Sequence, residues 1–214
     1  MNQILVADKV EEIFTDMLVN QFAAVVLRGF DLTKRYLHDP ELSSGMNPEL
    51  IPTLRRVCVN KLLHDFAAAR EDMSARYTTN KAKNSYFAQL RIGPFILTCH
   101  HVLSLRMPPR HAKYRESLAQ LNMFSEAFPE LAPDFEENGI YANLVFSGKH
   151  DNLTGIGLGI PDQQTKGWHY FKILPIVPQV PQAEIEDTDR EILLGIKEQF
   201  SKEGSPAKKR KAEG

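Results

Sequence analysis

Three segments with the composition of β-strands lie between residues 140 and 176, and only short polar stretches separate them. These segments are IYANLVFS (140–147), LTGIGLGI (153–160) and WHYFKILPI (168–176). Parallel neighbours need a crossover of roughly a dozen or more residues, and the connections here are too short to supply one. We therefore expect the three segments to pair as antiparallel neighbours.

Two further strands are predicted upstream of this group. SYFAQLRI (85–92) alternates between two faces, and FILTCHHVLSL (95–105) follows it after a Gly-Pro turn signal. The short turn indicates a hairpin, which brings the predicted number of strands to five.

Helical periodicity dominates the first 76 residues. Apolar side chains between Ala7 and His38 recur at intervals of three and four, and Gly29 interrupts the pattern, which predicts two helices or one bent helix. Asn47-Pro48 has the composition of a helix start, and the helix is expected to run to about Arg76. Further helices are expected over 109–128 and 187–200.

The predicted class is α+β: a five-stranded, mostly antiparallel sheet covered on one side by N-terminal helices. A single domain is expected over 1–200, helical in 1–76, mainly strands in 85–176, with a C-terminal helix in 187–200. The remaining segment, 201–214, is expected to be a disordered basic tail.

Cysteine content and hydropathy exclude several classes of protein. The only two cysteines, Cys58 and Cys99, have neither metal-ligand nor CxxC spacing, so a disulfide-framed secreted domain is not expected. The first residues lack the basic and apolar regions of a signal peptide. No segment approaches the roughly 20 apolar residues that a membrane span requires. These features predict a cytoplasmic protein without membrane contact.

Charge is segregated along the chain although the formal net charge is only −1. Residues 1–54 carry −4 and residues 120–198 carry −8, whereas residues 55–116, with twelve basic and four acidic side chains, carry +8. The tail adds +3. Such a basic block can neutralise the phosphates of a polyanion. The alternative is that the basic and acidic blocks interleave in the folded protein.

Nucleic acid, RNA or DNA, is the partner predicted for residues 76–115 and the tail. YTTNKAKNSYF (77–87) adds aromatic side chains that could stack on bases, although a polar loop before core aromatics is the alternative. The predicted phosphate contacts are Arg76, Lys81, Lys83, Arg91, Arg106, Lys113, Arg115, Lys208, Lys209 and Arg210.

The stretch TCHHVLSLRMPPRHAKYRESL (98–118) is rich in histidine and arginine. His100 and His101 are neighbours on a predicted strand, so they are expected to face opposite sides of the sheet rather than share a metal ion. Neither HxH nor HExxH spacing occurs here, and no metal or other cofactor is predicted.

A catalytic interpretation assigns His100, His111, Arg110 and Tyr114 to one site. A histidine would move the 2′-hydroxyl proton of RNA while arginines hold the charge that develops on the phosphate. The alternative for the same residues is a basic helix end exposed to water.

Glycines at 155, 157 and 159 alternate along a predicted strand. The pattern is GxGxG rather than GxGxxG, and no helix follows directly, so a nucleotide-binding turn is not expected. Alternating glycines instead leave one face of a strand bare, so that a helix or another backbone can approach.

Two functional hypotheses follow from these features. The first is a nucleic-acid-directed protein, such as a toxin-like or defence-associated metal-free ribonuclease. The second is a non-enzymatic protein-interaction module that forms a homodimer or binds a regulatory partner at the acidic region 126–198. A small-ligand pocket between the glycine-bearing strand and the first helices is a third, weaker option.

Overall fold

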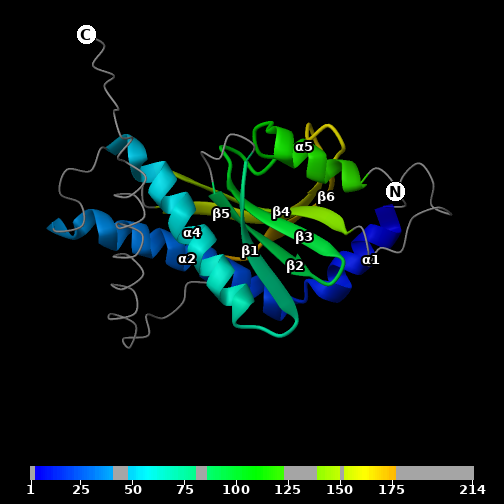
Figure 1. The fold of residues 1–214 in the computed structure, drawn as a ribbon, viewed down its shortest axis with the longest axis horizontal. Helices are drawn as coiled ribbons and strands as arrows, with labels where there is room; N and C mark the ends of the chain where they lie inside the picture. Colours follow the sequence, from blue (N-terminus) through cyan, green and yellow to red (C-terminus); the bar gives the residue numbers. More distant parts are fainter. Residues whose placement is uncertain (1–2, 41–47, 81–85, 123–138, 150–151, 177–214) are drawn as a thin grey trace, which may run out of the picture.

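The computed structural model describes residues 3–40, 48–80, 86–122, 139–149 and 152–176 (Figure 1). Its helices are α1 (Gln3–Ile13), α2 (Asp16–His38), α4 (Ile51–Ala68) and α5 (Lys113–Ala119), with 3₁₀ turns η1 (Pro48–Leu50) before α4 and η2 (Gln120–Asn122) after α5. Its strands are β1 (Met73–Thr79), β2 (Tyr86–Ile92), β3 (Phe95–His101), β4 (Ile140–Lys149), β5 (Asn152–Pro161) and β6 (Trp168–Leu174).

These strands form one six-stranded sheet in the order β1-β2-β3-β4-β5-β6. Every neighbouring pair is antiparallel except β3 and β4, which are parallel. The predicted α+β class and the predominance of antiparallel pairs are therefore confirmed. The single parallel pair arises because residues 102–139, which include α5, connect β3 to β4 and are long enough for a crossover.

The predicted number of five strands is wrong, because the helix expected to reach Arg76 ends at Ala68. Residues 73–79 form the additional strand β1, which pairs with β2 along its whole length. Met73 points toward the core, and Tyr77 stacks on His64 of α4 with ring centroids 4.4 Å apart. Alternation with a period of two from Met73 onward places these side chains toward α4, and this local pattern is the sequence signal for β1.

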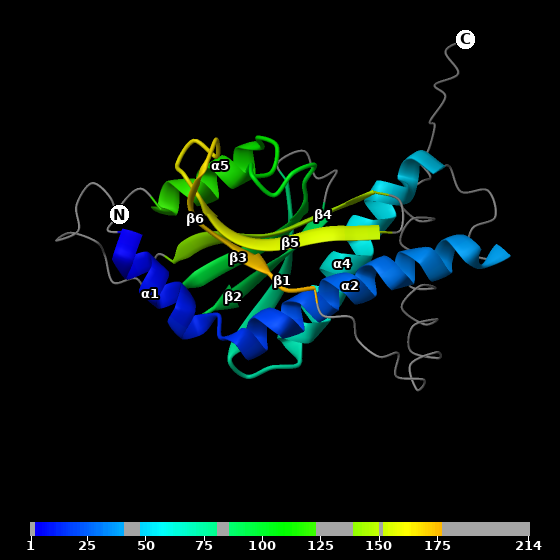
Figure 2. The same ribbon diagram turned by 180° about the vertical axis from the view of Figure 1, so that it is seen from behind.

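Helices cover both faces of the sheet, which corrects the expectation of a single helical layer. In Figure 2, α5 lies above the sheet and α2 below it. The helices α1, α2 and α4 pack on one face, whereas Tyr114 of α5 stacks on Phe87, which belongs to the opposite face of β2. The helix predicted over 109–128 is short, since α5 begins at Lys113 and gives way to η2 at Gln120.

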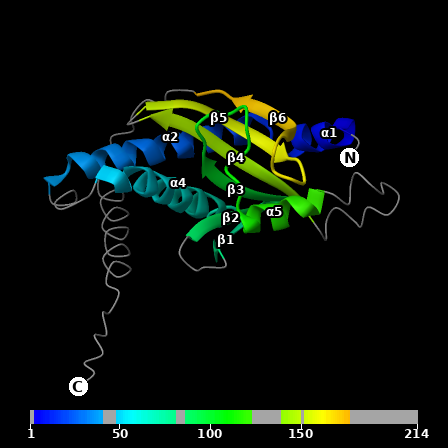
Figure 3. The same cartoon turned by 90° about the horizontal axis from the view of Figure 1, so that it is seen from above.

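The break in the N-terminal helical region lies at Phe14–Thr15, not at Gly29 as predicted. The Thr15 side chain caps α2 by accepting a hydrogen bond from the Leu18 amide at 3.4 Å. Gly29 lies inside α2, where the backbone of α4 comes close at Val59. The two helices run side by side and extend past the end of the sheet (Figures 1 and 3).

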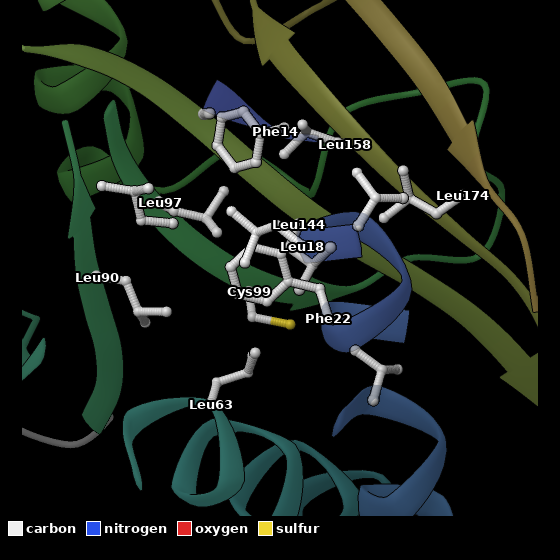
Figure 4. Close-up of a cluster of buried hydrophobic side chains, with 14 of the residues drawn as sticks. Phe14, Leu18, Phe22, Leu63, Leu90, Leu97, Cys99, Leu144, Leu158 and Leu174 are labelled. Carbon is white, nitrogen blue, oxygen red and sulfur yellow. The ribbon is translucent and has the colours of Figure 1, made fainter. Parts of the chain in front are cut away.

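The main core fills the layer between α1, α2, α4 and the sheet (Figure 4). Phe14 and Phe22 lie against Leu97, Leu144 and Leu158, one from each of three central strands. A second, smaller cluster holds the projecting parts of α2 and α4 together, and it consists of Leu32, Tyr36, Leu54, Cys58 and Leu62. Period-two alternation in the strands supplies the apolar face, as the sequence pattern predicts.

In the described parts of the chain, no individual helix has the length and apolar character to span a membrane. The pair Ala7–Ile13 and Asp16–His38 meets that criterion only when taken together, across a 75° bend. The C-terminal helix predicted over 187–200 and the tail 201–214 lie outside the described residues.

Candidate anion-binding pocket

A pocket of about 790 Å³ opens where β3 ends, between the first turns of α4 and the chain that leads to α5. Its lining residues are Pro52, Thr53, Arg56, His100, His101, Val102, Leu103, Ser104, Met107, Pro108, Pro109, Arg110 and Arg115. Three arginines from separate segments therefore meet at one hollow, and no acidic side chain belongs to the lining that the structure describes.

His100 forms part of the buried floor of this pocket, with 6% of its surface exposed. Its Nε2 lies 2.7 Å from the hydroxyl oxygen of Thr98, two residues earlier on the same face of β3. That hydroxyl lies 2.8 Å from the hydroxyl of Tyr141, which donates to Oδ1 of Asn143 at 2.9 Å. Because β3 and β4 are in parallel register, the alternate residues of both strands build one buried polar network.

The pKa of His100 lies well below its ordinary value of 6.5. Burial is the largest cause, because desolvation disfavours the imidazolium, and the positive charges of Arg115 and Arg56 act in the same direction. His100 is therefore a neutral imidazole at pH 7. It offers the pocket a hydrogen-bonding group without a charge.

Arg115 is held in place by its neighbours on the α5 side. Its Nη1 donates to the Tyr114 hydroxyl at 2.7 Å, and its Nη2 donates to the carbonyl oxygen of Arg110. Tyr114 in turn stacks on Phe87 of β2, with ring centroids 4.3 Å apart. The guanidinium is thus anchored to the sheet through one aromatic pair, which orients it toward the pocket at low entropic cost.

Tyr114 keeps its phenol proton at neutral pH. Burial raises the pKa of its hydroxyl and outweighs the opposing effect of Arg115. Its ring centroid lies 6.3 Å from that of His100. Tyr114 therefore supports the site through packing and through its hydrogen bond to Arg115.

His101 borders the same pocket from the other side of β3. Its Nε2 lies 3.1 Å from the carbonyl oxygen of Gly148, and its ring packs on Phe146 in the main core. The two histidines do face opposite sides of the sheet, as the alternation predicts. Both border one hollow because the pocket lies at the end of the strand.

The glycine-bearing strand β5 supports one wall of the pocket. A Cβ at Gly155 would lie 2.7 Å from the side chain of Leu105, and the Trp168 indole donates to the Leu105 carbonyl oxygen at 3.1 Å. Aromatic rings of Phe171 and Trp168 occupy the bare face at Gly157 and Gly159. The predicted bare face is confirmed, but side chains occupy it rather than the expected helix or backbone, and one of them comes from the segment that lines the pocket.

Of the four residues given a catalytic role from the sequence, two line the pocket, His100 and Arg110. Tyr114 lies behind Arg115, as described above. His111 is exposed, with its Nε2 3.1 Å from Oε2 of Glu116, and it does not belong to the lining. The structure brings Arg56 to the site instead, although it is far from His100 in the sequence and carries no local signal.

The predicted phosphate contacts that the structure describes lie on the α5 side of the sheet. Arg76 on β1 donates to Gln89 of β2 at 3.2 Å, and Arg91 follows on the same face of β2. Lys113 begins α5 and is exposed, as is Arg106. Five further residues lie outside the described residues, namely Lys81, Lys83, Lys208, Lys209 and Arg210.

No three His, Cys, Asp or Glu side chains converge to hold a metal ion in the portion of the chain covered by the structure. The acidic region 126–198 is described only in 139–149 and 152–176, so its predicted partner site lies largely outside the described residues. Comparison with models of protein families, with curated proteins and with solved structures found no match to this chain.

Proposed function

We propose that this protein binds nucleic acid through its α5 side, with the pocket at the end of β3 as the main phosphate site. The observation that carries this proposal is the meeting of Arg56, Arg110 and Arg115 around one hollow. Guanidinium groups are planar and can donate two parallel hydrogen bonds to a phosphate.

Basic side chains extend from the pocket across the same face of the sheet. Arg76 and Arg91 share the face that carries His100, because the β1–β2–β3 register places alternate residues together. Residues 73–122 contain eight lysines and arginines but only one acidic residue, Glu116. A surface of this kind attracts a polyanion over a longer range than a single pocket would. A cytoplasmic location, where RNA and DNA are accessible, belongs to the same proposal.

Cleavage of the bound strand is a second candidate function, and the position of His100 at the floor of the pocket favours it. His100 is unprotonated at pH 7, as a general base must be, but its low pKa makes it a weak base unless a bound anion raises that pKa. The imidazolium formed in the reaction would stand beside Arg56 and Arg115, so a bound phosphate would have to offset the repulsion. This is the toxin-like or defence-associated ribonuclease hypothesis in its simplest form.

Binding to single-stranded RNA and to duplex DNA over a salt series tests the proposal, with cleavage scored in the same samples. Replacing both Arg76 and Arg91 by Gln should reduce the slope of log K against log salt for RNA by about 1.4, because each lost contact removes about 0.7. Lys34→Gln, on an exposed position of α2, is the control and should leave the slope unchanged.

Absence of binding to either nucleic acid at about 50 mM salt would overturn the proposal. A salt-insensitive homodimer in that experiment would favour the interaction module, in which the basic and acidic regions meet between protein chains.

A further inference from the structure

The pocket is larger than a contact for one backbone phosphate requires. Its volume of about 790 Å³ falls within the roughly 300–1,000 Å³ that small-molecule sites usually have. The lining includes buried residues, His100, Val102 and Pro109, so the hollow is closed at its base. A nucleic-acid strand that passes along the surface reaches only the mouth of such a hollow, whereas the terminal nucleotide of a strand can enter it.

One part of the pocket wall is apolar and faces solvent. Leu103 and Met107 are exposed over 83% and 56% of their surface, although both side chains are large and apolar. Pro108 continues this wall next to Arg110. A flat, weakly polar group such as a nucleobase would cover these side chains while the guanidinium groups hold an anion.

The charge of the lining suits an anion with more than one negative charge. A terminal phosphate monoester carries close to two charges at neutral pH, since its second pKa is about 6, whereas an internal phosphodiester carries one. The lining offers three guanidinium groups, and His100 adds a neutral hydrogen-bonding group near Arg56 and Arg115. A monoester also presents more free oxygen atoms to several donors than a diester does.

We propose that the pocket takes the phosphorylated end of a nucleic-acid strand. The phosphate monoester lies against Arg56, Arg110 and Arg115, and the terminal base lies against Leu103 and Met107. This inference rests on the proposed function and names the part of the nucleic acid that the pocket selects.

The test uses one single-stranded RNA twelve nucleotides long, labelled at an internal position, in three forms: with a 5′-phosphate, with a 3′-phosphate, and with hydroxyl groups at both ends. We expect one phosphorylated form to bind at least tenfold more tightly than the hydroxyl form, and the two phosphorylated forms show which end is selected. The matching nucleoside monophosphate should displace this RNA from the wild-type protein, whereas the nucleoside alone should not.

Arg110→Gln should remove the preference for the phosphorylated end, because it takes away one of the three guanidinium groups of the pocket. Arg110 is exposed and not part of the core, so the substitution should leave the fold intact. Arg76→Gln is the matched control outside the pocket, and it should weaken all three RNA forms by a similar factor. Leu103→Ser should weaken the phosphorylated form severalfold and should have less effect when the terminal nucleotide lacks its base.

Tight binding with less than a twofold difference between the three RNA forms would overturn end recognition and leave the proposed function standing. The same holds if the nucleoside monophosphate does not compete. Failure of all three forms to bind at low salt would overturn both proposals, so the two failures are distinguishable.

Discussion

His100 shows how one residue acquires its properties from its surroundings. Alternation along β3 and β4 places it with Thr98, Tyr141 and Asn143, all buried on one face. Thr98 and His100 are two residues apart on a predicted strand, so the sequence alone places their side chains on one face. The proximity of Arg56 has no such signal, because it depends on how α4 crosses the end of the sheet.

The low pKa of His100 predicts a specific pH dependence of stability. The histidine takes up a proton near pH 6.5 in the unfolded chain but only at lower pH in the folded protein. The unfolded state therefore binds more protons below pH 6.5, and the free energy of unfolding falls as the pH drops through this window. His100→Asn should reduce the slope, by at most about 1.4 kcal/mol per pH unit.

Urea denaturation of the wild type and of His100→Asn between pH 5 and pH 8.5 measures this effect. Above about pH 7.5 the histidine is neutral in both states, so the two proteins should show parallel curves there. Parallel curves over the whole range would contradict the assignment of a buried neutral imidazole.

The elements of the fold show where close packing limits the choice of residue. Gly29 of α2 lies against α4, where an added Cβ would be 2.5 Å from Cγ2 and 3.0 Å from Cα of Val59. The helical period predicts α2 and most of α4, but it treats Gly29 as an interruption. Only the crossing of the two helices shows that the glycine permits their close approach.

Gly29→Ala should lower the free energy of unfolding by about 1–3 kcal/mol, because the methyl group overpacks the helix crossing. This would occur although alanine favours an isolated helix by about 1 kcal/mol over glycine. Asn20→Ala, at an exposed position of the same helix, is the control and should be neutral or slightly stabilising.

Thermal and urea unfolding of both variants measure the difference. In a Val59→Ala background the loss caused by Gly29→Ala should shrink, because the nearest atom at the crossing is gone. An unchanged or increased stability of Gly29→Ala would show that the helices separate at no cost.

At the scale of the whole molecule, the N-terminal helix is tied to the last described strand. Glu11 of α1 accepts hydrogen bonds from the Tyr170 hydroxyl at 2.9 Å and from Lys172 Nζ at 2.8 Å, both on β6. These hydrogen bonds, Lys172 first and Tyr170 second, lower the pKa of Glu11 below its ordinary value of 4.5. The contact joins parts of the chain that are far apart in sequence.

Glu11→Gln should destabilise the protein by less than about 1 kcal/mol at pH 7, because the group is largely exposed and screened by solvent. A carboxyl with a lowered pKa contributes stability above its unfolded pKa and loses it as the pH falls through the folded value. The difference between wild type and variant should therefore decrease as the pH falls below about 4.3, the ordinary pKa of a glutamate in an unfolded chain.

A double-mutant cycle of Glu11→Gln with Lys172→Met, followed by urea denaturation at pH 7 and at pH 3.5, measures this coupling. A coupling energy as large at pH 3.5 as at pH 7 would show that the carboxylate charge is not its source.

Local patterns account for most of the elements. The period of two predicts β2, β3, β4, β5 and β6. The short connections in 140–176 predict that β4, β5 and β6 pair as antiparallel neighbours. Strand formation and hairpin pairing can be predicted in this way because each depends on residues close together in the sequence. The strand β1 and the 14–15 break were missed although each has a local cue, the alternation after Met73 and the Thr15 cap. Short-range sequence patterns can therefore predict individual helices and strands, their ends, and the hairpins between neighbouring strands.

The parallel pairing of β3 with β4 and the position of α5 on the second face depend on contacts between distant residues. The pocket has the same origin, since Arg56, His100 and Arg115 come from α4, β3 and α5. Charge segregation identifies a basic block within residues 55–116, but it does not indicate where the basic side chains meet. That arrangement follows from burial of apolar faces on both sides of one sheet, which brings the ends of three elements together.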